Sequence, residues 1–318
     1  MYGVSHFALI GVDIIREGDA FHCEMCDHIL LRDSELSGGT GAHETVKINQ
    51  SQFVYIEGSD IHGADDNAID FVAVQYGHVS GNQIHDARDW CMYAKGGSAY
   101  LTFSGNEVFD CGTGGITAGQ GTGFEFMAAP WLNYEAYGIQ IVNNIVHDTE
   151  GAGLGVAGGF NVVLAYNTLY KVGTRSHVVE FVHGRRGCDG TPDPCAAHHD
   201  AGGWGSTEGE EALIPNRHVY FYDNLILNPS GVQSKWQQFQ IDGRIDPAPS
   251  SGVPSPSLAD DDLRIAGNVI WNGCVTGRTR PSPFQVHLGR HPGNGGTSRR
   301  GMIQPDSARA HPTPATRL

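Results

Sequence analysis

The chain has 318 residues, of which 44 are glycine, and 40% of its residues are hydrophobic. Its formal net charge of −15 argues against nucleic acid as a partner, because binding to phosphates requires a basic surface. The sequence contains no run of about 20 apolar residues, so we expect no transmembrane helix.

The N-terminal residues, MYGVSHFALIGVDII, do not have the pattern of a signal peptide. They carry no basic segment, no long apolar core and no small-residue cleavage site. The first copy of the repeat described next starts almost at Met1, so we expect the chain to be a fragment of a longer protein.

One short motif recurs along the chain: an apolar residue, two variable residues, Asn or Ser, one variable residue and a second apolar residue. In chain order its copies read LRDSEL, IEGSDI, VSGNQI, FSGNEV, IVNNIV, LAYNTL, FYDNLI and IAGNVI, after a degenerate first copy, LIGVDI. The Asn/Ser column falls at Ser34, Ser59, Asn82, Asn106, Asn144, Asn167, Asn224 and Asn268. An aliphatic residue follows each of these after two positions.

The spacing of the early copies, about 22 to 25 residues, predicts a parallel β-helix in which three short strands and three bends form one coil. The period is too short for a propeller blade, and neither a helical repeat pattern nor the framework of a leucine-rich repeat is present. We therefore expect an all-β solenoid of about nine or more coils. The aliphatic column should fill the interior, and the Asn/Ser column should form ladders at a bend.

Three longer spacings, of about 38, 57 and 44 residues, predict loop insertions on one side of the solenoid. We place the insertions near residues 119–133, 184–215 and 231–260. The second contains CDGTPDPC, in which Cys188 and Cys195 can close a small disulfide. The β-helix domain should span residues 1–286, and the tail 287–318 should be disordered because it shows no coil pattern.

Counting from the bend column places Lys47, Asp70, Tyr93 and Lys95 on one outer face of consecutive coils, because strand side chains alternate between inside and outside. Lys95 lies in DWCMYAKGGS, mid-strand and close to acidic turns. A lysine in this position can act as a general base. The alternative is a solvated surface lysine.

A group of aspartates lies on the same coils. GADDNAID and DARDW supply the predicted ligands of a Ca²⁺ site, which prefers oxygen donors: Asp65, Asp66, Asp70 and Asp89. The same carboxyl groups could instead form a general acid/base pair or cap turns.

The segments AKGGSAYLTFSGNEVFDCGTGGITAGQGTGFEF and YGIQIVNNIVHDTEGAGLGVAGGFNVVLAYNTL resemble the right-handed parallel β-helix repeat proteins, a group related to pectate, alginate and chondroitin lyases. The resemblance implies β-elimination on an acidic polysaccharide, with Lys95 as the base, Tyr93 as proton donor, Asp89 at the catalytic centre and Ca²⁺ as cofactor. Such lyases carry an arginine on the next coil, where this chain has Ala118 and Gly119, so Arg88 or Arg175 would have to replace it.

The resemblance also implies a protein that is secreted, periplasmic or on the cell surface, and we expect it to be a monomer. We expect the polysaccharide to contact a set of cationic and aromatic residues: Lys47, Arg88, Trp131, Tyr134, His177 and Trp204.

Two alternatives to a lyase stay open. ARDWCMYAKGG and CGTGGITAG are similar to polygalacturonase motifs, which would make the chain a glycoside hydrolase acting through Asp66 and Asp89. The histidine expected in the second motif is replaced by Gly114 or Gly115. The other alternative is a non-catalytic β-helix that binds carbohydrate or has a structural role at a surface.

Overall fold

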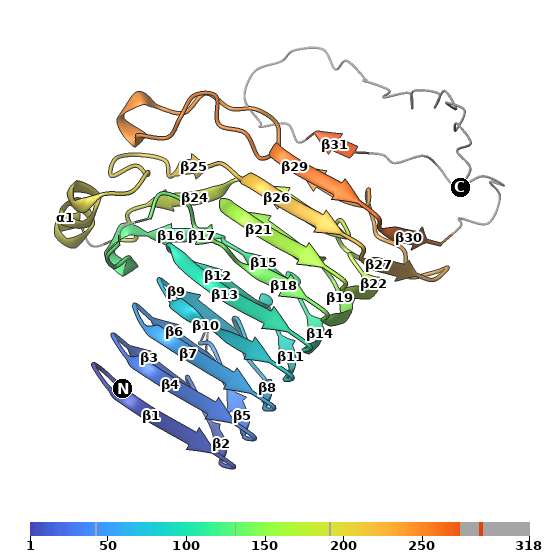
Figure 1. The fold of residues 1–318 in the computed structure, drawn as a ribbon, viewed down its shortest axis with the longest axis horizontal. Helices are drawn as coiled ribbons and strands as arrows, with labels where there is room; N and C mark the ends of the chain where they lie inside the picture. The colour runs from blue at the N-terminus through green and yellow to red at the C-terminus, as the bar shows by residue number, and fades with distance from the viewer. Residues whose placement is uncertain (42, 131, 191, 274–285, 289–318) are drawn as a thin grey trace, which may run out of the picture.

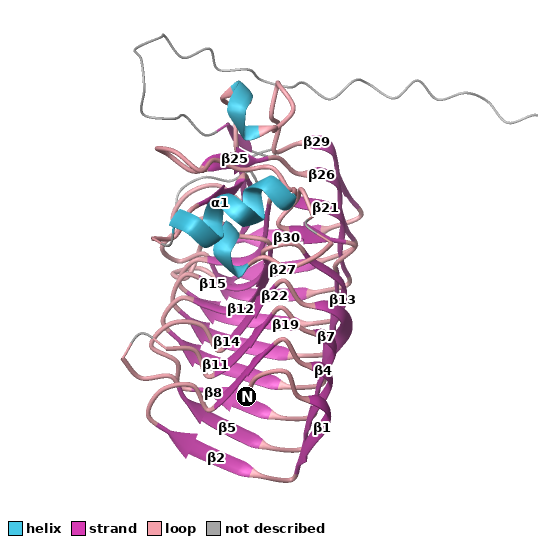
Figure 2. Ribbon diagram, turned by 90° about the vertical axis from the view of Figure 1, so that its left-hand side faces the viewer, coloured by secondary structure: helices cyan, strands magenta, loops and turns pink. Residues whose placement is uncertain are grey.

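The fold is a right-handed parallel β-helix, as predicted, in which each coil contributes one strand to each of three long sheets (Figure 1). The computed structural model describes residues 1–318 except 42, 131, 191, 274–285 and 289–318. Strands of successive coils pair in parallel and lie directly above one another (Figure 2). The predicted tail lies outside the described residues apart from residues 287 and 288.

Sheet 1 has ten strands. They are β1 (Ser5–Ile10), β4 (Asp27–Arg32), β7 (Gln52–Glu57), β10 (Gln75–Ser80), β13 (Ser98–Ser104), β17 (Ala136–Tyr137), β18 (Gln140–Val142), β21 (Gly159–Ala165), β26 (Arg217–Tyr222) and β29 (Asp261–Ala266).

Sheet 2 has nine strands. They are β2 (Asp13–Arg16), β5 (Glu35–Gly38), β8 (Asp60–His62), β11 (Gln83–Ala87), β14 (Glu107–Cys111), β19 (Ile145–Thr149), β22 (Thr168–Val172), β27 (Leu225–Asn228) and β30 (Val269–Asn272).

Sheet 3 has nine strands. They are β3 (Phe21–Glu24), β6 (Val46–Asn49), β9 (Ile69–Val72), β12 (Trp90–Lys95), β15 (Gly114–Ala118), β20 (Ala152–Ala157), β23 (Val179–Val182), β28 (Phe239–Ile241) and β31 (Val286–Leu288).

The Asn/Ser column lies at the bend between sheets 1 and 2 and forms the predicted ladder. Asn106 Nδ2 donates to Asn144 Oδ1 at 2.9 Å, and Asn144 Nδ2 donates to Asn167 Oδ1 at 3.0 Å. The aliphatic column two residues later is completely buried over most of its length: Leu36, Ile61, Ile84, Val108, Val146, Leu169 and Ile226. The repeat therefore specifies both the interior of the solenoid and the hydrogen bonding at one of its bends.

The insertions gather on one side of the stack, at the left of Figure 1. A small sheet of β16 (Gly121–Gly123), β24 (Gly184–Gly187) and β25 (Ala212–Ile214) lies there with the helix α1 (Pro192–Ala201) and the 3₁₀ turn η1 (Phe124–Phe126). A second 3₁₀ turn, η2, spans Pro249–Ser251. Because β16 follows β15 and β24 follows β23, these elements form a wall beside sheet 3.

Three disulfides join cysteines of the described residues: Cys23–Cys26, Cys91–Cys111 and Cys188–Cys195. The last confirms the pairing suggested by CDGTPDPC. Among the described helices, none combines the length and the apolar composition required to cross a membrane.

Candidate active site

The outer face of sheet 3 carries a column of polar side chains. The strand register places Lys47 opposite Asp70 and Asp70 opposite Tyr93, so these residues share one face of three consecutive coils, as predicted. Lys95 lies two residues after Tyr93, and its Nζ is 4.4 Å from the centroid of the Tyr93 ring. The same Nζ donates to Gln120 Oε1 at 3.2 Å.

Lys47 joins two buried carboxyl groups on this face. Its Nζ lies 2.9 Å from Glu44 Oε1 and 3.4 Å from Asp70 Oδ2. Burial raises the pKa of Asp70 to about 6, although the charges of Lys95 and Lys47 oppose this shift. Burial acts on Glu44 in the same sense, but Lys47 outweighs it and holds the pKa of Glu44 below its ordinary value. The Asp70 carboxyl group is therefore protonated more readily than that of Glu44.

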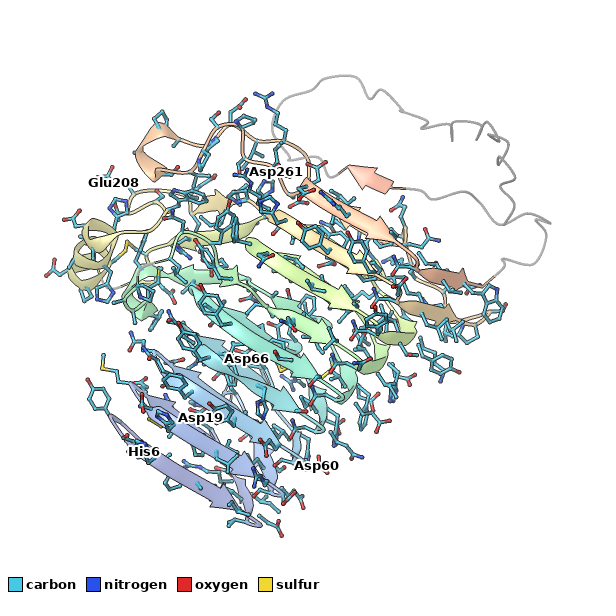
Figure 3. All side chains as sticks on the ribbon, viewed as in Figure 1. His6, Asp19, Asp60, Asp66, Glu208 and Asp261 are labelled. Atoms are coloured by element: carbon cyan, nitrogen blue, oxygen red, sulfur yellow. A yellow bond between two sulfur atoms is a disulfide. The ribbon has the colours of Figure 1, made fainter. Side chains whose placement is uncertain are left out.

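Asp66 and Tyr93 share a hydrogen-bond donor. Asn67 Nδ2 lies 3.0 Å from Asp66 Oδ1 and 3.1 Å from the Tyr93 hydroxyl. Burial raises the pKa of Asp66, and the nearby charges of Glu44 and Asp89 add to this effect. Burial also raises the pKa of Tyr93 well above its ordinary value, so the phenol keeps its proton. Figure 3 labels Asp66.

A cavity of about 380 Å³ continues along this face toward the C-terminal coils. Thr117, Gly155 and Glu180 extend the column of Asp70 and Tyr93 into it through the strand register. A Cβ at Gly155 would lie only 2.9 Å from both the Trp90 ring and Thr117 Oγ1, so glycine keeps the floor of the cavity open. The remaining lining residues are Gln120, Gly121, Val156, Ala157, Val182, His183 and Arg185.

Three ionisable side chains line this cavity. Burial raises the pKa of Glu180, whose Oε1 accepts a hydrogen bond from Ser176 Oγ at 3.1 Å. The Nδ1 atom of His183 lies 3.5 Å from Asp242 Oδ2, and the backbone N–H of His183 donates to the same oxygen at 3.1 Å. Arg185 supplies a guanidinium from β24, which pairs with β16 of the insertion. The cavity is thus lined by a carboxyl group, an imidazole and a guanidinium. Lys95 lies at its edge, where it is hydrogen-bonded to the lining residue Gln120.

The structure does not bring the predicted substrate-binding residues into this cavity. Tyr134 is buried, and its ring centroid lies 4.9 Å from that of Trp204, so the two rings pack on each other within the insertion. His177 is also buried, and its ring centroid lies 5.7 Å from that of Trp236. Arg88 is exposed and lies 3.4 Å from Asp65. Trp131 lies outside the described residues.

The four predicted calcium ligands do not form a binding group in the described part of the chain. Asp70 is ion-paired with Lys47, while Asp65 accepts a hydrogen bond from the Gly41 amide at 2.7 Å and contacts Arg88. These four carboxylates are absent from the clusters whose ligand atoms lie within 4.8 Å of one another. Calcium binding stays a prediction.

Sequence reasoning missed the residues that line the far end of the cavity. Glu180 lies in VVEFV, where apolar residues flank one polar residue, and this alternation could have placed it on the outer face. His183 and Arg185 follow at the start of a long insertion. No sequence signal connects His183 with Asp242, because their contact joins two distant segments.

Comparison with known proteins supports the fold. A family model described as "Right handed beta helix region" matches residues 19–186. No curated protein matches the chain.

Three of the solved structures that are similar to the chain have 11 to 13% sequence identity to it and TM-scores below 0.5. The Dettilon tailspike protein gp208 is 11% identical, with a TM-score of 0.46, over 85% of this chain and 52% of its own. The alginate lyase from Paenibacillus sp. str. FPU-7 is 13% identical, with a TM-score of 0.49, over 73% of this chain and 74% of its own. The A-module of Azotobacter vinelandii mannuronan C-5 epimerase AlgE4 is 13% identical, with a TM-score of 0.41, over 83% and 79%.

Proposed function

Because the chain belongs to the right-handed β-helix family, we propose that it binds an acidic polysaccharide along the outer face of sheet 3 and cleaves it by β-elimination. The observation that carries this proposal is the combination of groups at one cavity. Arg185 and Glu180 line it, and Lys95 lies at its edge, where it donates a hydrogen bond to Gln120. A cation, an acid and a basic amine are the groups that this reaction requires.

β-Elimination breaks the C5–H bond of a uronate, forms a C4–C5 double bond and expels the O4 leaving group. Arg185 would hold the carboxylate, because a guanidinium binds two oxygens at once and stabilises the negative charge that develops there. The Lys95 amine would act as the general base that accepts the C5 proton. Glu180 would donate a proton to O4, since burial raises its pKa and favours the protonated acid.

Tyr93 has a supporting position in this proposal. Its side chain is 3% exposed and its ring lies beneath Lys95, so it contacts the lysine and the Asn67 amide. Asp89 would not contact the substrate; its negative charge would act from a distance by raising the pKa of Asp66.

The test is to incubate the protein with alginate, polygalacturonate or chondroitin sulfate and to follow absorbance near 235 nm, where the unsaturated uronate product absorbs. We expect activity on one of these polymers and its loss in Lys95→Ala. Lys95→Met keeps the length of the side chain that packs on Tyr93 but removes the amine, so it separates packing from proton transfer. Activity retained in Lys95→Met would contradict the proposed base. Lys171→Ala, at a half-buried lysine of sheet 2, is the matched control.

A hydrolase is the second candidate, favoured by the raised pKa values of Asp66 and Asp70 beside an ionised Glu44. Carboxyl groups with separated pKa values are the usual pair for acid/base hydrolysis of a glycosidic bond. Release of reducing ends without absorbance near 235 nm, lost in Asp66→Asn, would support hydrolysis and exclude the lyase reaction.

The disulfides support a location outside the cytosol. Such bonds persist in oxidising compartments and are rare where thiols are kept reduced. With three of them in the described residues, we propose that the protein folds and acts in a secreted, periplasmic or surface-exposed setting.

A further inference from the structure

A second group of ionisable side chains lies at the N-terminal end of sheet 3, separate from the cavity that contains Glu180. It consists of Asp19, just before β3, and of His43 and Glu44, just before β6. Because β3 and β6 are neighbours, two consecutive coils bring the three residues together. One ligand atom from each of them lies within 4.8 Å of the others.

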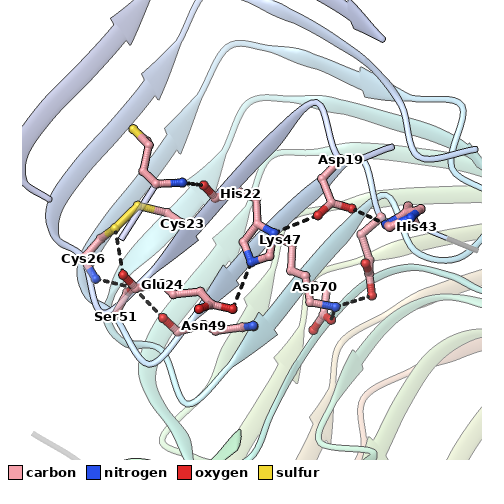
Figure 4. A network of polar contacts seen from close by, with 12 residues as sticks. Asp19, His22, Cys23, Glu24, Cys26, His43, Lys47, Asn49, Ser51 and Asp70 are labelled. Atoms are coloured by element: carbon pink, nitrogen blue, oxygen red, sulfur yellow. Dashed lines mark hydrogen bonds and ion pairs between the residues drawn. A yellow bond between two sulfur atoms is a disulfide. The ribbon is translucent and has the colours of Figure 1, made fainter. Parts of the chain in front are cut away.

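The carboxylate of Asp19 is held between two imidazoles (Figure 4). His22 Nδ1 lies 2.8 Å from Asp19 Oδ2, and His43 Nδ1 lies 3.2 Å from Asp19 Oδ1. Ligands bound at about 2.0 Å in a tetrahedral site are separated by roughly 3.3 Å, close to the His43–Asp19 separation. His22 would orient Asp19 from behind, as outer partners of metal ligands do.

The position of the Glu44 carboxylate is fixed by an ion pair with Lys47. Lys47 Nζ lies 2.9 Å from Glu44 Oε1, and the Glu44 residue is only 6% exposed. The Glu44 carboxylate therefore has little freedom to move, which lowers the entropy lost on binding an ion.

Two of the three residues, Asp19 and His43, open into a hollow that Glu44 does not line. A surface cavity of about 610 Å³ is lined by Asp19, His22 and His43 together with Arg16, Glu17, Gly18, Thr40 and Gly41. It leaves room for water molecules to complete the coordination of an ion held by three protein ligands. Three protein ligands with an open position are the arrangement of an accessible metal site.

We propose that Asp19, His43 and Glu44 bind a first-row divalent transition-metal ion, for which Zn²⁺ serves as the probe. One imidazole nitrogen and two carboxylates suit such an ion, whereas Ca²⁺ and Mg²⁺ prefer oxygen ligands alone. The site is distinct from the aspartate set predicted from sequence for Ca²⁺. It does not depend on the proposed lyase activity.

The experiment must first remove a second group of residues that could also bind the metal ion. His6, Asp27 and His28 form another group with ligand atoms within 4.8 Å, and Figure 3 labels His6 and Asp19 at separate places on the N-terminal coils. Zn²⁺ titration by calorimetry is therefore done on His28→Ala protein. We expect one saturable site, with Zn²⁺ bound more tightly than Ca²⁺.

Adding Asp19→Asn or His43→Ala to this background should weaken Zn²⁺ binding at least tenfold. His62→Ala is the matched control, because His62 also contacts a carboxylate, Glu35 at 3.3 Å, but lies on sheet 2. Thermal unfolding without metal shows whether each variant is folded. Absence of saturable binding in His28→Ala, tighter Ca²⁺ than Zn²⁺ binding, or equal Zn²⁺ affinity in folded Asp19→Asn protein would overturn the proposal.

Discussion

Asp70 shows how burial on the outer face of a solenoid changes the chemistry of a single residue. Its side chain is only 2% exposed although it points away from the interior, because neighbouring coils and loops cover it. The pKa of this carboxyl is about 6 in the folded chain and near 3.8 in its ordinary state. The folded protein therefore binds this proton more tightly than the unfolded chain does.

The stability contributed by the Asp70 proton is complete below about pH 4 and is lost as the pH rises through about 6. Asp70→Asn removes this titration. Relative to the original protein, the free energy of unfolding of the variant should therefore rise by about 3 kcal/mol between pH 3.5 and 7.5. Urea unfolding at a series of pH values measures this difference. A difference that does not change with pH would show that Asp70 titrates normally.

Arg186 is a residue whose role is structural although it neighbours a proposed substrate contact. Arg186 and Glu135 are both fully buried, and Arg186 Nη2 lies 2.7 Å from Glu135 Oε1. The guanidinium also donates to backbone carbonyls of the insertion at Leu132 and Asn133. Removing one partner of such a pair leaves a buried charge without compensation.

We expect Arg186→Gln to lower the free energy of unfolding by about 3 to 5 kcal/mol. The adjacent Arg185 is the matched comparison, because its side chain is 61% exposed and its ion pair with Glu211 is 3.9 Å long. Arg185→Gln should change stability by less than about 1 kcal/mol. Chemical denaturation compares the two variants, and equal effects would contradict the role assigned to Arg186.

At the scale of the repeating elements, the asparagine ladder links each coil to the next. Asn144 lies in its middle, where its Oδ1 accepts from both the backbone N–H and the side-chain amide of Asn106. Its Nδ2 donates to the Phe103 carbonyl at 2.9 Å. A buried donor that loses its partner costs more free energy than the hydrogen bond contributes when formed.

Asn144→Ala should therefore lower the free energy of unfolding by about 2 to 4 kcal/mol, since the buried backbone N–H of Asn106 loses its acceptor and the Asn106 side-chain amide keeps only the Val79 carbonyl. Asn268→Ala is the control at the C-terminal end of the ladder, where the residue is only half-buried. We expect a clearly smaller loss there. If thermal and urea unfolding gave the same loss for both, the ladder would not be stabilising through burial.

Across the whole molecule, each coil is stabilised mainly by the coils directly above and below it. Among the described strands, β1 pairs with β4 alone, and its residues Phe7 and Leu9 are only half-buried. In β13, by contrast, Leu101 and Phe103 are completely buried between neighbouring coils. The stability of the backbone should therefore differ along the solenoid axis.

Hydrogen exchange followed by mass spectrometry tests this difference. Amides of β1 should exchange at least tenfold faster than amides of β13, because local opening at the first coil breaks contacts on one side only. Equal protection of the two strands would mean that the solenoid opens as one cooperative unit.

The predictable part of this protein is the coil. Because strand side chains alternate and coils stack in register, the periodic Asn/Ser and aliphatic columns were sufficient to place the interior, the ladder and the shared face of Lys47, Asp70 and Tyr93. These features depend on local pattern and on contacts between adjacent copies of one repeat.

The cavity could not be predicted in the same way. Its floor requires glycine at residue 155, and its walls bring Glu180, His183 and Arg185 beside Gln120 from coils separated by insertions of unequal length. The pairing of His183 with Asp242 crosses one of these insertions. An insertion breaks the period, so residue spacing no longer reports spatial distance, and only the packed chain shows which side chains meet.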